Sequence, residues 1–291
     1  MVIAEEKWYK SGNNKPYEPK TVQEALNGRD KGKWKEAMKE EIMNFINRGV
    51  WKKVSKESIP QGRKPVKCKW VLKVKTEQDH SYRYKARCVV LGYALNPKQG
   101  DVYETFSPVA SEVSVRLLEG YALYRKWPCH MIDVQAAFLE SEIAEDLWIS
   151  WPEACVDLGI ITEKEQLTTC AKLIKAQYGV AQAPRCWYKK LSLTLKDLGL
   201  TRSKADPCVF FGYDESGNLN LALITVVDDT LIIGEEEAIL KFKEDFKKKF
   251  TITDLGEITK HLGVWYERKN DNEGEYFEIS MTDFVTACER L

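Results

Sequence analysis

Residues 219–234, LNLALITVVDDTLIIG, form an apolar run that two adjacent acids interrupt at its centre. An ionised carboxylate in an apolar strand is costly unless it is paired or bound to a metal. The run is therefore expected to fold as a β-hairpin that carries Asp228 and Asp229 near its turn. A second apolar strand, within CHMIDVQAAFL (129–139), holds one acid, Asp133, and raises the same problem.

Each of these acids alone has an ordinary explanation, because a single acid at a strand end is usually a cap or an ion pair, and two acids in a hairpin are usually just a turn. If the strand ending at Asp133 lies beside the hairpin, however, three carboxylates converge on one solvent-facing edge of a sheet. Side chains alternate along a strand, so Asp228 and Asp229 share a face only if the turn twists, and we expect Asp228 to dominate the chemistry.

Hard oxygen ligands of this kind suit Mg²⁺ or Mn²⁺. Two such ions about 4 Å apart can activate a 3′-hydroxyl and stabilise a leaving pyrophosphate. The pattern therefore indicates the palm of a polynucleotide polymerase.

The rest of the chain alternates helices with hairpins. Helical periodicity is expected over 33–47, 111–127, 185–199 and 235–250, and Gly49 is a natural C-cap signal. Hairpins are expected at 68–93 and at 261–280, the latter turning at DNEG. Hairpins argue against an all-parallel sheet, so the prediction is an α+β fold with helices on one face of a mainly antiparallel sheet. Residues 1–20 are expected to be a loose leader.

Charge is uneven although the 44 basic and 44 acidic residues give a formal net charge of zero. Nine Lys or Arg residues against two acids lie from Arg63 to Arg87, and the six of them within the predicted 68–93 hairpin are interspersed with apolar residues. A solvated outer face is the ordinary explanation; period-two spacing on paired strands also favours a face that binds anions.

The eight cysteines include no CxxC pair and there are three histidines, which indicates neither a zinc module nor a disulfide framework. No apolar window is long enough for a membrane helix, and the charged start does not suit a signal peptide.

Seven motifs in order, YKARCVVLGY, YETFSPVAS, MIDVQAAFL, YGVAQAPRCWY, ADPCVFF, VVDDTLIIG and DLGEITKHLG, closely resemble the reverse transcriptase of copia-type LTR retrotransposons. The resemblance covers about residues 17–291. It implies a right-hand polymerase fold, with fingers at roughly 34–108 and 140–180 and a palm at roughly 109–139 and 181–270. By the same resemblance, residues 271–291 are a truncated continuation, and ribonuclease H and integrase are absent.

The resemblance also implies roles for single residues. Asp133 is the first catalytic aspartate, and Asp228 with Asp229 completes a site for two Mg²⁺ or Mn²⁺ ions. Phe138 stacks under the incoming sugar and excludes a 2′-hydroxyl, unless it is simply a core residue. Gln182, in QAPR, hydrogen-bonds a base or sugar, unless QAPR is a plain helix start. The basic residues implied to grip the triphosphate, with the choice among them open, are Lys73, Lys75, Lys85 and Arg87.

The implied partners are an RNA template, a DNA or RNA primer, a dNTP, the RNA–DNA hybrid and the missing polyprotein domains, with no membrane. The implied location is the cytoplasm, in a virus-like particle, with nuclear access left open.

This chain departs from the family pattern at two positions. Val226 stands where the family usually has Tyr, which gives the motif YVDD, and Ala181 stands where the family often has a basic residue. Two hypotheses remain: an RNA-directed DNA polymerase core, or a catalytically silent, host-retained remnant that acts as a nucleic-acid-binding module.

Overall fold

The structure is a computed structural model that describes residues 16–77, 79, 81–96, 100–101, 104–272, 274–282, 285 and 288. The chain divides into two compact units: unit 1 is Met1–Phe106 with Phe138–Cys186, and unit 2 is Ser107–Ala137 with Trp187–Leu291. Every pair of named strands in both units is antiparallel, which confirms the mixed α+β class. Most of the predicted leader, residues 1–15, lies outside the described residues.

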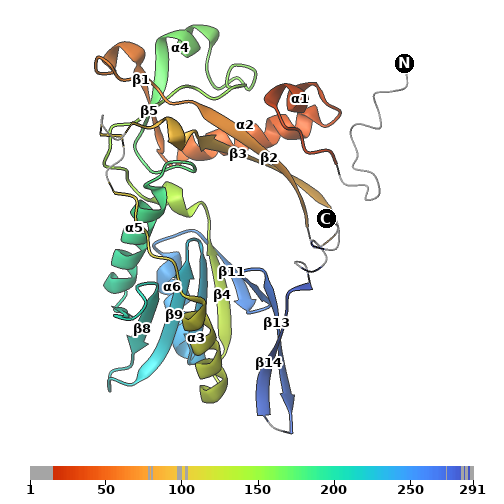
Figure 1. The fold of residues 1–291 in the computed structure, drawn as a ribbon, viewed down its shortest axis with the longest axis vertical. Coiled ribbons are helices and arrows are strands. Elements are labelled where there is room, and N and C mark those ends of the chain that lie inside the picture. The colour runs from red at the N-terminus through yellow and green to blue at the C-terminus, as the bar shows by residue number, and fades with distance from the viewer. Residues whose placement is uncertain are drawn as a thin grey trace. The chain divides into compact units, whose positions relative to one another are not determined.

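Unit 1 is built around the basic hairpin, which forms as predicted (Figure 1). Leu72, Val74 and Ala86 lie on one face of the hairpin and pack with Trp34 and Met38 of the second helix in a buried cluster. The helices of unit 1 are α1 (Val22–Asn27), α2 (Lys31–Asn47) and α4 (Glu163–Thr168), with short 3₁₀ helices η2 (Lys56–Ser58) and η3 (Gly92–Ala94). Its strands are β1 (Trp51–Ser55), β2 (Cys68–Thr76), β3 (Tyr82–Val90), β5 (Trp148–Ile149) and β6 (Thr169–Leu173).

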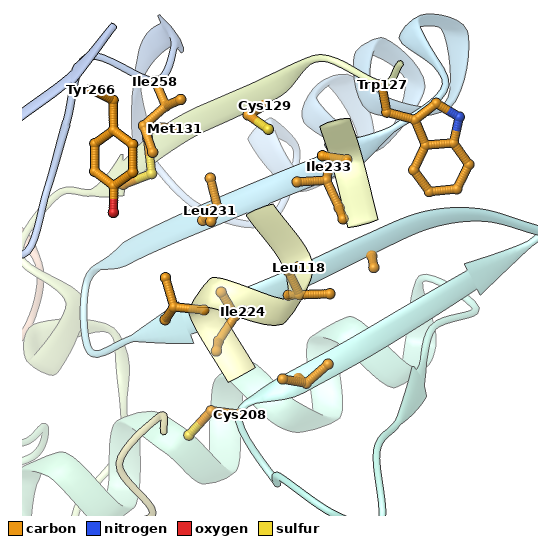
Figure 2. Close-up of a cluster of buried hydrophobic side chains, with 14 of the residues drawn as sticks. Leu118, Trp127, Cys129, Met131, Cys208, Ile224, Leu231, Ile233, Ile258 and Tyr266 are labelled. Carbon is orange, nitrogen blue, oxygen red and sulfur yellow. The ribbon is translucent and has the colours of Figure 1, made fainter. Parts of the chain in front are cut away.

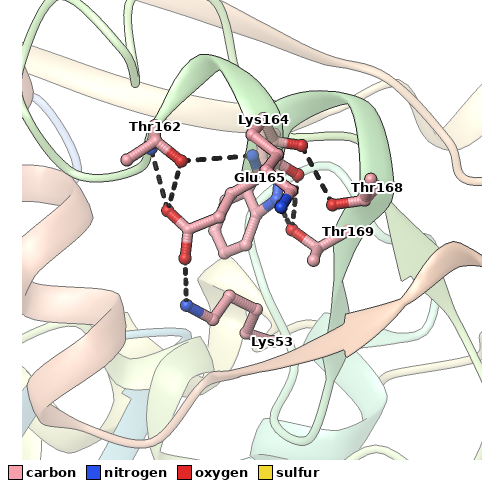
Figure 3. Close-up of polar contacts among 7 residues, drawn as sticks. Lys53, Thr162, Lys164, Glu165, Thr168 and Thr169 are labelled. Atoms are coloured by element: carbon pink, nitrogen blue, oxygen red, sulfur yellow. Dashed lines mark hydrogen bonds and ion pairs between the residues drawn. The ribbon is translucent and has the colours of Figure 1, made fainter.

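A second sheet of unit 1, in the order β1-β6-β5, carries α4 at one end. Helix α4 begins with a capping box: Thr162 accepts a hydrogen bond from the backbone of Glu165, and the Glu165 carboxylate accepts one from the backbone of Thr162 (Figure 3). The same carboxylate forms an ion pair of 2.6 Å with Lys53 on β1. These contacts hold the pKa of Glu165 at about 2 and tie α4 to the sheet.

Unit 2 contains a six-stranded sheet, in the order β11-β4-β10-β9-β8-β7, and a three-stranded sheet, in the order β12-β13-β14. The predicted acidic hairpin is β9–β10, and its neighbour β4 carries Asp133. The elements of unit 2 are α3 (Glu112–Arg125), α6 (Glu236–Lys247), β4 (Cys129–Val134), β7 (Thr201–Arg202), β8 (Val209–Tyr213), β9 (Leu219–Val226), β10 (Asp229–Gly234), β11 (Ile252–Glu257), β12 (Lys260–His261), β13 (Val264–Asp271) and β14 (Gly274–Ser280). The chain passes between the units three times: after Phe106, within η5 (Ala137–Glu140) and within α5 (Ala183–Asp197).

Helices cover both faces of the six-stranded sheet, so the prediction of helices on one face is wrong. Leu118 of α3 packs with Met131, Ile224 and Leu231 on one face (Figure 2). On the other face, Lys243 of α6 reaches His130 of β4. The reason is visible in the runs LALIT and TLIIG, because strands buried on both faces read as continuous apolar runs rather than alternating ones.

The other predicted elements are present near their expected bounds. Helix α2 ends at Asn47, and Gly49 has a φ of +64°, as a C-cap glycine requires. The hairpin predicted at 261–280 is β13–β14, with Asp271 opposite Gly274; its turn residue Glu273 lies outside the described residues. Within the part of the chain that the structure describes, no helix combines the length and apolarity that a bilayer crossing needs.

Candidate active site

The three predicted acids lie at one end of the paired strands β4 and β10 of unit 2. Asp229 is directly opposite Asp133 in the strand register, and residues directly opposite share a face of the sheet. Asp228 lies in the two-residue turn that joins Val226 to Asp229, and its carbonyl oxygen accepts a hydrogen bond of 2.9 Å from the Val134 backbone. The register thus places Asp229 across from Asp133 and ties the backbone of Asp228 to the end of β4.

The turn itself is strained. Val227, its first residue, has a φ of +58°, which tight two-residue hairpin turns require but which a β-branched residue rarely adopts. The Nε1 atom of Trp187 donates a hydrogen bond of 2.5 Å to the Val227 carbonyl oxygen. Trp187 is 1% exposed, and its ring packs edge-on against Phe250 with centroids 5.2 Å apart. A buried side chain of α5 therefore holds the strained turn that carries Asp228.

The acids concentrate negative charge at this end of the sheet. Burial, followed by the negative charges of Asp228 and Asp133, raises the pKa of Asp229 to about 6. Such a rise means that the ionised form of Asp229 is disfavoured where it stands. A nearby cation would offset both causes and would favour the ionised form.

The donor set fits a hard divalent cation in chemistry. Mg²⁺ commonly binds through one or two carboxylates, with waters and substrate phosphates as its remaining ligands. Asp133 and Asp229 supply two facing carboxylates from neighbouring strands, and Asp228 adds a third from the turn. Among the residues that the structure describes, no group of three or more acid, histidine or cysteine side chains is arranged so that it could hold a metal ion.

The predicted basic face is present on the hairpin of unit 1. Lys73 lies opposite Lys85, Lys75 opposite Arg83, and Arg87 opposite Val71, so Lys73, Lys75, Lys85 and Arg87 share the face that points away from α2. Lys73 forms an ion pair of 3.0 Å with Glu18. Partial burial, and then the positive charges of Arg87, Lys75 and Arg83, lower the pKa of Lys85. The face therefore carries mutually repelling cations, which a bound anion would relieve.

Phe138 and Arg87 are both in contact with Tyr178. The rings of Phe138 and Tyr178 meet edge to face, with centroids 5.5 Å apart and planes at 68°. The guanidinium carbon of Arg87 lies 5.4 Å from the centroid of the Tyr178 ring. Phe138 is partly exposed rather than fully buried. Two of the residues implied to bind the nucleotide are thus joined through a third side chain of unit 1.

Gln182 lies inside unit 1, with 1% of its surface exposed. Its Nε2 atom donates a hydrogen bond of 2.9 Å to the Asp101 carbonyl oxygen. Its Oε1 atom is buried and accepts no hydrogen bond from any residue that the structure describes. The side chain of Asp101 is itself held by Arg63 and by the Asn96 backbone. Gln182 therefore serves at least to join α5 to the segment around Asp101.

The chain matches the family model described as reverse transcriptase (RNA-dependent DNA polymerase) over residues 48–288. Because this match spans most of the chain, the protein belongs to that family and is a reverse transcriptase domain.

Its relatives define the type. The chain is 35% identical over 250 residues to the Retrovirus-related Pol polyprotein from transposon TNT 1-94 of Nicotiana tabacum, covering 85% of this chain and 18% of that protein. It is 34% identical over 253 residues to the corresponding polyprotein from transposon RE1 of Arabidopsis thaliana, covering 86% and 16%. These are copia-type Pol polyproteins, so the resemblance seen in the motifs is confirmed. The chain spans less than a fifth of the length of either relative.

Sequence reasoning missed two residues that contact the predicted site residues or the turn that carries them, one in each unit. Trp187 and Tyr178 both stand in the motif YGVAQAPRCWY, yet nothing in their spacing indicates a turn carbonyl or a pair of side chains as their partners. The partner of Trp187 is Val227, 40 positions along the chain. The partners of Tyr178 are Arg87 on β3 and Phe138 in η5. The only available signal was an aromatic residue on each side of QAP.

Proposed function

We propose that this domain is the RNA-directed DNA polymerase core of a copia-type Pol polyprotein. It would transfer a nucleotide from a dNTP to a primer 3′-hydroxyl, copying an RNA template and producing an RNA–DNA hybrid. The observation that carries this proposal is the register of β4 and β10, which brings Asp133 and Asp229 face to face beside the turn residue Asp228. Family membership supports the same chemistry.

The two units then correspond to the parts of a right-hand polymerase. Unit 1, with its basic hairpin, is proposed as the fingers, and unit 2, with the acidic hairpin, as the palm. The division at residues 106, 137 and 186 supports boundaries near 108, 139 and 181. Location in a cytoplasmic virus-like particle and association with other polyprotein domains, such as ribonuclease H, belong to the same proposal.

Asp133, Asp228 and Asp229 are the residues that would hold two Mg²⁺ or Mn²⁺ ions. When bound, these ions lower the pKa of the primer hydroxyl and neutralise charge on the leaving pyrophosphate. The protein's own contribution is mainly positioning: the strand register holds the carboxylates, and Trp187 holds the turn.

In unit 1, the nucleotide would meet residues that differ in chemistry. Lys73, Lys75 and Lys85 offer point charges to the triphosphate, whereas Arg87 offers a planar fork. Phe138 would stack under the sugar and exclude a 2′-hydroxyl. Gln182 has a buried oxygen and a nitrogen bound to Asp101, so its proposed contact with a base or sugar needs a change of its side-chain partners.

Primer extension on an RNA template with Mg²⁺ or Mn²⁺ tests the proposal. Wild type should extend the primer, and Asp133→Asn and Asp228→Asn should not. Asp245→Asn, on α6, is the matched control because it removes a half-buried carboxylate of unit 2 that forms an ion pair with Lys248, an exposed lysine of the next turn. If wild type extends no better than Asp228→Asn, the polymerase proposal fails. Salt-dependent binding of an RNA–DNA hybrid would in that case favour the nucleic-acid-binding module.

A further inference from the structure

Tyr178 stands between two residues that the proposed function assigns to the nucleotide. Its ring meets the Phe138 ring edge to face, and the Arg87 guanidinium lies over it, 5.4 Å from its centroid. Edge-to-face aromatic pairs and cations over aromatic faces both have preferred geometries. A single side chain therefore restricts the orientation of both neighbours.

The backbone of Tyr178 is fixed to β3, the strand that carries Arg87. The Tyr178 carbonyl oxygen accepts a hydrogen bond of 2.8 Å from the Val90 backbone. The preceding side chain, Gln177, is fully buried and donates a hydrogen bond of 2.9 Å to the Cys88 carbonyl oxygen. A Cβ atom on the following residue, Gly179, would lie 2.1 Å from the Val90 carbonyl oxygen, so only glycine permits this approach. The ring is thus anchored to β3 by its own backbone and by both adjacent residues.

The same segment is also joined to the residues that follow Phe138. The Ala176 backbone donates a hydrogen bond of 2.8 Å to the Ser141 carbonyl oxygen. The Ser141 backbone in turn donates one of 3.2 Å to the Phe138 carbonyl oxygen. Backbone contacts therefore place Phe138 near Tyr178, and the ring contact is left to determine the direction of the Phe138 side chain.

We propose that Tyr178 is a positioning residue that sets the Phe138 ring against the sugar and the Arg87 guanidinium against the triphosphate of the incoming nucleotide. This inference rests on the proposed function. It predicts that the Tyr178 ring, rather than its hydroxyl, supports two properties together: discrimination between dNTP and rNTP, through Phe138, and affinity for the triphosphate, through Arg87. A residue that merely filled space would support stability alone.

The test measures single-nucleotide incorporation of a dNTP and of the matching rNTP by wild type, Tyr178→Leu and Tyr178→Phe. Tyr178→Leu should raise the dNTP KM roughly three- to tenfold and lower the dNTP-to-rNTP ratio of kcat/KM by a similar factor, because each lost ring contact has a modest energy. Tyr178→Phe should rescue both. Tyr124→Leu is the control, since Tyr124 is 81% exposed on α3 in unit 2.

The outcomes are separable. If wild type incorporates no nucleotide, the proposed function fails. If wild type is active but Tyr178→Leu keeps both its dNTP KM and its selectivity within twofold, the inference about Tyr178 is overturned. Should Tyr178→Leu not fold, Tyr178→Met tests the same contacts, because a flexible apolar side chain fills the space without presenting a ring. An unchanged dNTP KM together with an unchanged dNTP-to-rNTP ratio in Tyr178→Met then overturns the inference, and a several-fold change in both supports it.

Discussion

Trp187→Phe is the substitution that most directly tests how the acidic turn is held. It keeps an aromatic ring beside Phe250 and removes the Nε1–H that the Val227 carbonyl oxygen accepts. Val227 has a φ of +58°, and nothing in its side chain favours that conformation. Without the indole hydrogen bond, the turn should relax and Asp228 should move with it.

The expected size follows from the two interactions involved. One hydrogen bond within a protein contributes about 1 kcal/mol, and an unfavourable backbone conformation of this kind stores about 1–3 kcal/mol that the surroundings must hold. If the loss of these interactions raises the activation free energy of nucleotide transfer by about 1 to 2 kcal/mol, kcat should fall about 5- to 30-fold. The smaller ring also leaves a gap at a residue that is 1% exposed, so the free energy of unfolding should fall by roughly 1–2 kcal/mol.

Steady-state primer extension, giving kcat and the dNTP KM separately, measures the effect, and urea unfolding measures stability. Trp127→Phe is the matched control, because Trp127 is 5% exposed in the core of the same unit and packs on Tyr121 rather than on the turn. Both variants should lose stability, but only Trp187→Phe should lose kcat, with its KM unchanged. Equal kcat values in the two variants would refute the assigned role of Trp187.

Three further predictions concern charge. Because burial and two neighbouring acids raise the pKa of Asp229 from 3.8 to about 6, the folded protein binds protons more readily than the unfolded chain between those values, and stability falls as pH rises through them. Asp229→Asn should therefore abolish primer extension yet stabilise the fold at pH 8 by about 1 kcal/mol, a figure reduced for solvent screening and measurable by urea unfolding. By the same sign, burial raises the pKa of Glu41 from 4.5 to about 7, so wild type should lose up to about 3 kcal/mol of stability between pH 5 and pH 8. Glu41→Gln keeps the acceptor for the Cys88 backbone and should flatten that part of the profile; an equally steep profile would contradict the assignment. Lys85→Ala should reduce the slope of log K against log salt for RNA–DNA hybrid binding by about one, and an unchanged slope would exclude Lys85 from contact with the phosphates of the hybrid.

Patterns along the chain were sufficient to predict the elements and part of the site. The period-two alternation of Lys73, Lys75 and Lys85 predicted a hairpin with one basic face, and the strand register confirms it. The apolar runs around Asp133 and Asp228 predicted two strands, and the pairing of β4 with β10 meets the condition on which the three-carboxylate hypothesis depended. These features follow from local periodicity and from the cost of burying charge, which a sequence displays directly.

Other features depend on contacts between distant segments. Nothing along the sequence indicates that Asp229, rather than Asp228, lies opposite Asp133, because the register depends on how the turn is closed. The buried position of Gln182 depends on Asp101, a residue 81 positions away. The helices on both faces of the large sheet could have been predicted, since the continuous apolar run of β10 is the pattern of a strand buried on both sides.

Val227 shows why local preference is a poor guide beside the acids. A β-branched residue is among the least suited to a positive φ, and glycine or asparagine is preferred in such turns. The turn nevertheless closes here, with the Val227 carbonyl bound by Trp187 and the Asp228 carbonyl bound by the Val134 backbone. Two hydrogen bonds from different elements thus restrain consecutive residues of one turn. Tertiary contacts overrule the local preference at the point where the position of a carboxylate matters most, which is where sequence rules are expected to fail.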